Sequence, residues 1–543
     1  MCNFLPGKVE IFSGFTIKMG IDLRKISIRT WIILAGIFLY LASLWQRPLF
    51  ISEFSFGSDA AQALHNGTVP PVSDALFYLI FKYLGTSPFA FRLIPALLTL
   101  LVAGILYLAG RKSTFSGAAG AGALIYLLTP AVFLCGTTAF ELVCKAAPVA
   151  AGLWLLFLLS ESSSWRKSLL SGTAAAVALT VSICVWGGAV HFLFALGAWL
   201  IYSICSLFFS DCESRKSCMV KVAVSILPFL PGAILCSRAL PGAELQLPHI
   251  SNMKTLAAFA AAGSFPWVIF LPAVLRNFSS RLAAIIHDRF TLMALILSVF
   301  SLVTALFTPA SSGILLLFPA GFAVLLGAGM DMEYTENGSR FLNVVLYILA
   351  ALFFLCAIAL GAYAALGLYT STLKTAWKVF TAKDAWILTA LVPAVAGVWC
   401  ITAAGEKIYK ERKFLALCAG TAFLLLAFHG LVPLKAVENN APVKFLEQAV
   451  RTRVQKNTVI YCSKELFTPA KNVLKNATVK YLLTAEEMAE LNFAVKARKS
   501  ICVLTSSRQL SDALPFPKTT LRSGRFSAVF YNIDFPEMRV RKP

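Results

Sequence analysis

The chain has 543 residues, of which 58% are hydrophobic and only 14% are charged, and its mean hydropathy is +0.76. This composition excludes a water-soluble globular fold, because such domains have about 45–50% apolar and about 25% charged residues. The formal net charge of +22 would suit nucleic-acid binding, but the basic residues occupy loops between apolar segments, which indicates a membrane protein.

About thirteen apolar segments fill the first four-fifths of the chain, and we interpret each as a membrane-spanning helix. A helix needs about 20 apolar residues to cross the hydrocarbon layer, where only a helix or a closed barrel satisfies its own backbone groups. The sequence therefore predicts an all-α polytopic membrane bundle, the domain of residues 30–433. The predicted spans are residues 30–46, 92–109, 117–135, 142–159, 169–187, 189–209, 219–236, 255–275, 290–307, 312–329, 341–365, 385–404 and 414–433.

The placement of positive charge predicts the orientation of the bundle. Basic residues precede the first span, in residues 1–29, and recur in alternate loops, as at Arg111 and Lys112 or at Arg215 and Lys216. Cytoplasmic loops carry this excess, so we expect a cytoplasmic N-terminal segment. An odd number of spans then places the C-terminus outside. The first apolar run lacks a cleavage site, so we interpret it as a signal anchor. A bacterial inner membrane fits this organisation.

The chain changes character near residue 434, where a polar and basic C-terminal segment begins. Alternating strand and helix patterns predict a small extracytoplasmic α/β domain over residues 434–543. Its basic surface suits contact with lipid phosphates or an anionic acceptor, and it also suits plain solubility. The predicted strands are residues 457–464, 500–507 and 525–533, and the predicted helices are residues 465–476 and 484–497.

Cysteines give little indication of function. Most of the thirteen are scattered singly through the spans, where Cys behaves as a small apolar residue. Cys462 and Cys502 lie in the predicted outer domain and could form a disulfide or stay reduced, which the sequence leaves open.

The first outer loop, residues 47–91, gathers the ionisable side chains that suggest chemistry. Glu53, Asp59 and Asp74 lie on it. Residues 59–64 can form a short helix, and residues 75–84 are amphipathic, so we expect interfacial helices at the membrane surface. Candidate substrate-binding residues in or bordering this loop are Asp59, Asp74, Tyr78, Lys82 and Arg92.

The second outer loop ends at Glu141, at the mouth of the fourth predicted span, with Lys145 one turn further on. Ionisable residues at this depth are candidates for function, although the spacing also suits an ion pair within the helix. Glu53 and Glu141, on consecutive outer loops, could converge at one site. One would act as a general base, and the two together could hold a divalent metal ion.

Four segments in this order resemble the GT-C class of polyprenyl-phosphate-sugar glycosyltransferases, in particular the lipid A aminoarabinose transferase and protein O-mannosyltransferase group. The resemblance covers residues 30–330 well and the rest in outline. The matching segments are SEFSFGSDAAQALHNGTVPP (52–71), FRLIPALLTLLVAGILYLAGRK (91–112), AGSFPWVIFLPAVLR (262–276) and SSGILLLFPAGFAVLLG (311–327).

The resemblance implies transfer of a sugar, with inversion, from a polyprenyl-phosphate donor to a lipid, glycan or protein acceptor at the outer face. Glu53 would be the general base and Glu141 would support it or share a metal ion. Candidates for the donor phosphate are Lys82, Arg92, Arg238 and Lys254. The chain departs from the family where the acidic pair reads Ser52-Glu53, where an Arg is replaced by Ser55, and where Val69 and Trp186 replace lysines.

Two other classes of function stay open. A transporter or flippase would need charged or interrupted helices at mid-membrane, whereas the main polar candidates, Lys145 and His191, lie near span ends. A catalytically inactive assembly protein is favoured by the acid lost at Ser52.

Overall fold

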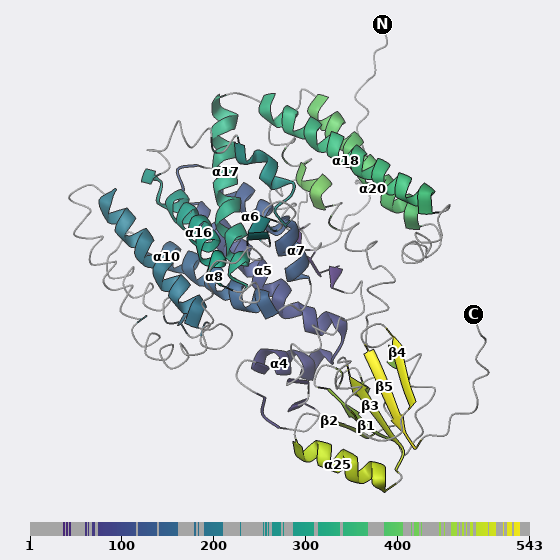
Figure 1. Cartoon of the computed structure of the whole chain (residues 1–543). Coiled ribbons are helices and arrows are strands. Elements are labelled where there is room, and N and C mark those ends of the chain that lie inside the picture. Colours follow the sequence, from purple (N-terminus) through teal and green to yellow (C-terminus); the bar gives the residue numbers. More distant parts are fainter. Residues whose placement is uncertain are drawn as a thin grey trace, which may run out of the picture.

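We examined a computed structural model of the whole chain, residues 1–543. The structure describes most of residues 68–160, 189–209, 286–367, 385–405 and 458–532, with gaps, and scattered residues elsewhere, including parts of 36–44, 60–64, 253–275 and 414–425. The larger part is helical, and a small mixed sheet lies towards the C-terminus (Figure 1).

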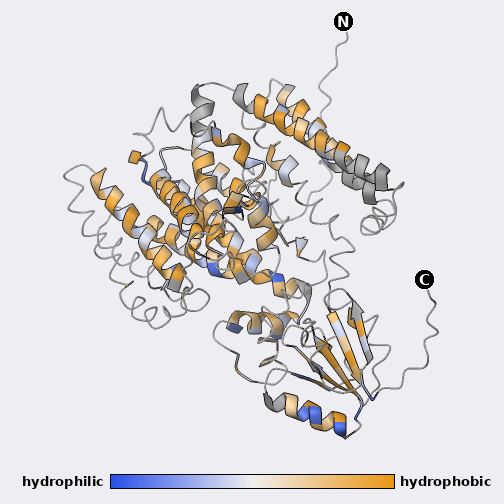
Figure 2. Ribbon diagram, viewed as in Figure 1, coloured by the Kyte–Doolittle hydropathy of each residue, from blue (hydrophilic) through white to orange (hydrophobic). Residues whose placement is uncertain are grey.

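The helical part contains long apolar helices that match predicted spans (Figure 2). Within the described residues, four helices are long and apolar enough to cross a membrane: Phe89–Gly110, Leu142–Leu159, Val190–Phe208 and Arg289–Leu306. The prediction of a polytopic membrane bundle is confirmed, while the number of about thirteen spans stays a prediction. The described helices are α4 (Ala75–Leu84), α5 (Pro88–Gly110), α6 (Ala118–Leu127), α7 (Pro130–Gly136), α8 (Glu141–Ser160), α10 (Ala189–Phe208), η5 (Trp267–Phe270), α16 (Arg289–Leu306), η7 (Ile314–Leu317), α17 (Phe318–Glu336), α18 (Arg340–Gly367) and α20 (Ala385–Gly405).

Small residues bring the central helices together. Gly321 of α17 lies against α16, so close that a Cβ there would stand 2.5 Å from the carbonyl oxygen of Ala294. Gly122 of α6 faces α17 in the same way, 3.2 Å from the Cα of Val324. Lipid is as apolar as the helix surfaces, so helices in membranes associate through such close packing rather than through hydrophobic burial.

The end of the bundle predicted to be cytoplasmic is fixed by a buried carboxylate. Asp288, 5% exposed, caps α16 by accepting from the backbone N–H of Thr291 (3.0 Å), and it also accepts from the Ser113 hydroxyl (2.9 Å) and the Thr114 N–H (3.0 Å). Nearby in the sequence, Lys112 donates to the Leu158 carbonyl at the end of α8 (2.5 Å). Asp288 therefore joins the loop after α5 to the start of α16.

Replacing Asp288 with Ala is expected to lower the free energy of unfolding by about 2.5–4 kcal/mol. The change removes a helix cap and hydrogen bonds to a charged acceptor, which contribute about 1 and about 1.5–3 kcal/mol respectively. Asp288→Ser is the matched control, since Ser can still cap α16 but does not reach the loop, and it should cost less. Thermal unfolding of both variants in detergent measures the difference. If Asp288→Ala were as stable as the wild type, Asp288 would not be fixing the loop after α5 to the start of α16.

The C-terminal sheet has five strands in the order β2-β1-β3-β5-β4, with β2, β1 and β3 parallel and β5 and β4 antiparallel. The predicted strands at 457–464, 500–507 and 525–533 and the helix at 484–497 are confirmed. The prediction of only three strands is wrong, because β2 (TVKY) and β4 (TTLRS) are edge strands too short and too polar to stand out in the sequence. The elements are β1 (Val459–Cys462), β2 (Thr478–Tyr481), α25 (Ala485–Lys496), β3 (Ile501–Thr505), β4 (Thr519–Ser523) and β5 (Phe526–Tyr531).

The two cysteines of the sheet are free thiols in the structure. Cys502 is opposite Ile460, so Cys462 lies two residues further along the neighbouring strand. Strands about 4.8 Å apart with a rise of about 3.3 Å per residue separate these Cα atoms by about 8 Å. Disulfides require less than about 7 Å, so the register does not favour a bridge.

We expect both thiols to stay reduced and unreactive in the folded protein. Burial raises the pKa of Cys462 and of Cys502 above the ordinary thiol value, which keeps both protonated at neutral pH, and only the thiolate reacts. An alkylating reagent should label them after unfolding without reductant, but not before. Mass spectrometry of peptides containing the two residues checks this, and recovery of a Cys462–Cys502 disulfide would contradict it.

Candidate functional site

A small apolar cluster joins the first outer loop to two spanning helices. Phe77 and Phe81 of α4 pack against Phe91 of α5, with the Phe81 and Phe91 ring centroids 4.5 Å apart. The same cluster includes two residues of the first outer loop and one of the first turn of α8. Its buried members are Ala60, Ala61, Phe77, Phe81, Ala90, Phe91, Ile94 and Cys144.

This junction brings the regions of the predicted acids together. Asp59 directly precedes Ala60, and Glu141 lies one turn before Cys144 on α8. Ala60 and Cys144 belong to one cluster, so a described part of the first outer loop packs in the same cluster as the start of α8. The positions of Glu53 and Asp59 and the side chain of Glu141 lie outside the described residues, so their convergence stays a prediction.

Helix α4 is the predicted interfacial helix, with the bounds expected from the sequence. It buries Phe77 and Phe81 and leaves Leu79 49% and Tyr83 77% exposed. One face of the helix therefore packs against the bundle, and another face presents exposed apolar side chains. This arrangement is typical of a helix that lies at the membrane surface. Gly85, with φ of 71°, ends the helix.

The predicted substrate-binding residues on and near α4 differ in accessibility. Asp74 and Tyr78 are partly buried, and Lys82 is exposed on the last turn of α4. Lys254, on a separate helical segment, is also exposed. Lys82 and Lys254 are therefore accessible to an anionic ligand from solvent. Arg238 lies outside the described residues.

Arg92 occupies a position that the sequence did not reveal. Helix α5 begins with Pro88 after the cap Ser87, whose hydroxyl accepts from the Ala90 N–H (3.3 Å). One turn later, Arg92 is fully buried and its Nη1 donates to the carbonyl of Leu44 (3.2 Å). Leu44 lies at the end of the first predicted span. Arg92 thus ties the entry of α5 to the start of the first outer loop.

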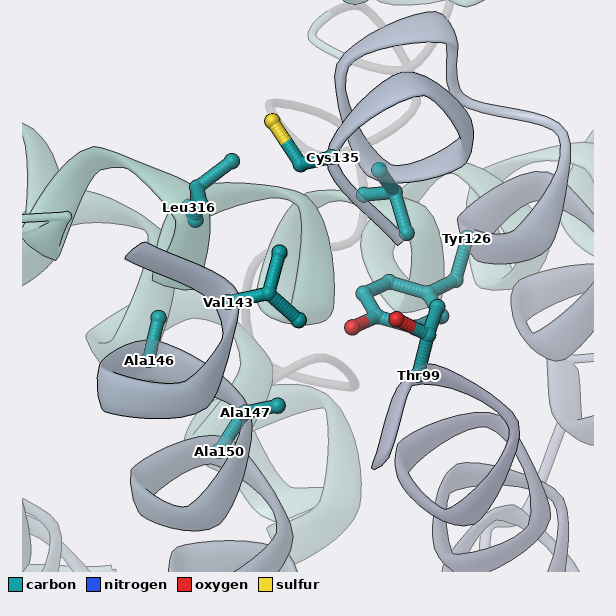
Figure 3. Close-up of a pocket in the computed structure, with 9 residues that line it drawn as sticks. Thr99, Tyr126, Cys135, Val143, Ala146, Ala147, Ala150 and Leu316 are labelled. Atoms are coloured by element: carbon teal, nitrogen blue, oxygen red, sulfur yellow. The ribbon is translucent and has the colours of Figure 1, made fainter. Parts of the chain in front are cut away.

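A narrow cavity lies between α5, α6, α7, α8 and η7 (Figure 3). The Thr99 and Tyr126 hydroxyls and the Cys135 thiol contribute its polar groups, while Val143 and Ala147 of α8 contribute apolar wall. Its free interior of about 10 Å³ is about what one water molecule requires. The cavity is too small for a sugar or a phosphate, and it faces the side of α8 opposite Glu141 and Lys145 in helical spacing.

The described residues contain no group of three or more His, Cys, Asp or Glu side chains that could hold a metal ion. Glu53 and the side chain of Glu141 lie outside the described residues, so the predicted divalent site stays a prediction. The second polar residue considered for transport, His191, is buried, with 3% of its surface exposed, in the first turn of α10.

Comparison with known proteins identifies the fold. No protein-family model and no curated protein sequence matches the chain, whereas solved structures do. The chain has the fold of ArnT, a member of the group that the sequence resemblance named. ArnT from Cupriavidus metallidurans in the apo state superposes with a TM-score of 0.65 at 16% identity, over 92% of this chain and 97% of that chain.

Two further structures are similar. The same ArnT bound to undecaprenyl phosphate has a TM-score of 0.63 at 14% identity, covering 93% of this chain and 98% of that one. The Archaeoglobus fulgidus oligosaccharyltransferase in its apo form has a TM-score of 0.48 at 11% identity, covering 89% and 70%. The two ArnT superpositions, at these identities, show a shared fold.

Proposed function

We propose that the chain is a membrane glycosyltransferase that moves a sugar from a polyprenyl-phosphate donor to a lipid, glycan or protein acceptor at the outer face of the membrane. The observation that carries the proposal is the junction of the first outer loop with α4, α5 and α8 within an ArnT-like fold. In this proposal the carboxylates of Glu53, Asp59 and Glu141 converge near this junction and provide acid–base groups. The ArnT structure with undecaprenyl phosphate supports the donor class.

In the proposed mechanism, Glu53 accepts the proton of the acceptor hydroxyl as its oxygen attacks the anomeric carbon. The polyprenyl phosphate leaves with the electron pair of the glycosidic bond, and the configuration inverts. Glu141 orients Glu53 or shares a divalent cation with it. We expect the two carboxylates within about 10 Å of each other, the range in which two groups can share one ligand.

In this scheme the exposed basic residues contact the donor phosphate, and the buried basic residue supports the structure around it. Lys82 and Lys254 are exposed and provide charge for the departing phosphate. Asp74, the N-cap of α4, and Tyr78, one turn before Lys82 on the same helix, suit the hydroxyls of the sugar. Arg92 has a supporting role, because its buried guanidinium donates a hydrogen bond to the Leu44 carbonyl. Because the guanidinium of Arg92 is fully buried, a phosphate contact would require the residues that cover it to move.

The direct test is a transfer assay. Purified protein in lipid vesicles receives a polyprenyl-phosphate sugar with a labelled sugar, together with an extract of candidate acceptors. We expect label to move from the donor to a second molecule and free polyprenyl phosphate to accumulate. Movement of intact donor between leaflets without cleavage would indicate a flippase, and neither result with a folded protein would indicate an assembly protein.

The proposed domains and orientation have their own prediction. We place residues 1–29 in the cytoplasm and residues 434–543 outside the membrane. A reporter enzyme active only outside the cytoplasm should be active when fused after Pro543 and silent when fused at Lys216. The reverse pair of activities would place the proposed site at the wrong face.

A further inference from the structure

The third predicted span is interrupted in the structure. The sequence predicts one helix over residues 117–135, whereas the structure has α6 and α7 with a break at Thr129. Pro130, the first residue of α7, has no N–H to donate, and its ring disfavours helical geometry in the residue before it. Thr129 is accordingly extended, with ψ of 121°. Irregular backbone inside a membrane bundle needs hydrogen-bond partners from protein or from water.

Two aromatic side chains supply such partners at the break. The hydroxyl of Tyr40, in the first predicted span, donates to the Leu127 carbonyl (3.0 Å). The indole Nε1 of Trp267, in η5, donates to the Leu128 carbonyl (3.2 Å). Both donor side chains are fully buried. Groups from distant parts of the chain therefore hold the end of α6 in its interrupted form.

One polar group beside the break lacks a protein partner within the described residues. Tyr126, in the last turn of α6, is 4% exposed, and its hydroxyl forms no hydrogen bond with another described residue. That hydroxyl points into the narrow cavity between α5, α6, α7, α8 and η7 (Figure 3). Buried hydroxyls nearly always bond to protein or to ordered water. The cavity therefore indicates a place for a small ligand that forms hydrogen bonds.

The other polar groups of the cavity define the chemistry of that ligand. The Thr99 hydroxyl of α5 donates to the Pro95 carbonyl (2.8 Å), so its oxygen faces a ligand as an acceptor. The Cys135 thiol of α7 also lines the cavity, and its sulfur is a weak acceptor. The described lining has no charged side chain. A neutral ligand that can both accept and donate hydrogen bonds is thus required.

We propose that the cavity is a binding site for a single ordered water molecule that bridges Tyr126 and Thr99. The water accepts from the Tyr126 hydroxyl and donates its two hydrogens to Thr99 Oγ1 and Cys135 Sγ. Those bonds give it about three partners, the usual number for a buried water, and the interior of about 10 Å³ holds one water and nothing larger. The water joins α5, α6 and α7 beside the interruption. The site is independent of the proposed transfer function, because no sugar or phosphate fits in it.

A structure that shows ordered waters tests the proposal directly. The full chain in lipid nanodiscs would be imaged by electron cryo-microscopy as the wild type and as Tyr126→Phe. We expect one water-sized peak in the wild type, within hydrogen-bond distance of the Tyr126 and Thr99 oxygens, and loss of that peak in the variant. A wild-type map without the peak overturns the proposal, as does a peak that persists unchanged in Tyr126→Phe.

Thermal unfolding in the same nanodiscs gives an independent test. Tyr126→Phe should lower the Tm because it removes a donor to the water, whereas loss of a buried hydroxyl without a partner should leave the Tm unchanged or raise it. Thr99→Val should lower the Tm as well. The decrease in the double variant should be smaller than the sum of the two single decreases, because either substitution alone already breaks the bridge.

Tyr347→Phe is the matched control, because Tyr347 of α18 is 49% exposed and lies away from the cavity; its Tm should equal that of the wild type. The bond from Thr99 to the Pro95 carbonyl is lost in both variants that carry Thr99→Val, so it cancels in the comparison. A Tyr126→Phe protein with a Tm at or above that of the wild type contradicts the bridge, and so do decreases that simply add. If the double variant does not fold, the wild-type map decides.

Discussion

Replacing Glu53 with Gln is expected to lower the rate of sugar transfer by about 10²–10⁴-fold, the usual effect of removing a general base. Gln keeps the shape and the hydrogen-bonding capacity of Glu but cannot accept the proton of an acceptor hydroxyl. The loss should appear in kcat more than in KM, because the proton moves in the transition state. Transfer of a labelled sugar, measured with protein shown to be folded and membrane-inserted, gives the result.

Variants of two other acids in the same region distinguish the proposed roles of the carboxylates. Glu141→Gln should cost less than Glu53→Gln if Glu141 only orients the base, and as much if both hold a metal ion. Asp59→Asn, on the same loop, removes a proposed substrate contact and should raise KM more than it lowers kcat. Full activity of Glu53→Gln would remove Glu53 from the mechanism, and loss of activity in Asp59→Asn would make Asp59 the next candidate for the base.

Arg92 needs a different substitution because it has a structural contact. Arg92→Ala removes both the charge and the donor to Leu44, so it confounds folding with catalysis. Arg92→Lys keeps the charge and one donor but loses the planar geometry that holds two acceptors at once. We therefore expect Arg92→Lys to be folded, with weaker use of the donor.

The sequence predicted those elements whose pattern is local. Runs of apolar residues of the right length located α5, α8, α10 and α16, because lipid imposes one requirement on every spanning segment. Helix α4 was predicted from its amphipathic pattern. The edge strands β2 and β4 were missed, because Thr478–Tyr481 and Thr519–Ser523 owe their strand geometry to neighbours that are distant in the sequence.

The candidate site was also predictable only in part, because it depends on contacts between residues that are distant in the sequence. Acids on consecutive outer loops suggested that the loops meet, and the cluster containing Ala60, Phe81 and Cys144 supports that meeting. Neither the burial of Arg92 nor its bond to Leu44 could be read from the sequence, since 48 positions separate the two residues. Asp288 was not predicted, because its bonds to Ser113 and Thr114 depend on how α16 approaches the loop after α5.

The contact between α16 and α17 should be highly sensitive to the addition of a single methyl group. In Gly321→Ala the new Cβ would lie 2.5 Å from the Ala294 carbonyl oxygen and 2.9 Å from the Ser298 nitrogen. Backbone atoms of a packed helix cannot turn aside as a side chain can, so the helices must separate. Overpacking costs about 1–3 kcal/mol and occasionally more, and we expect at least about 3 kcal/mol here, with loss of yield from the membrane.

A graded series of glycines in the same bundle provides the controls. Gly104→Ala of α5 meets no atom within 4 Å, and Gly122→Ala of α6 meets the Cα of Val324 at 3.2 Å. Since Ala favours a helix over Gly by about 1 kcal/mol, Gly104→Ala should be neutral or stabilising. Gly122→Ala should fall between it and Gly321→Ala in thermal stability. If the Gly321→Ala protein were as stable as Gly104→Ala, α16 and α17 could not approach each other so closely. The new methyl group would contact backbone atoms, and only moving the two helices apart would relieve that contact.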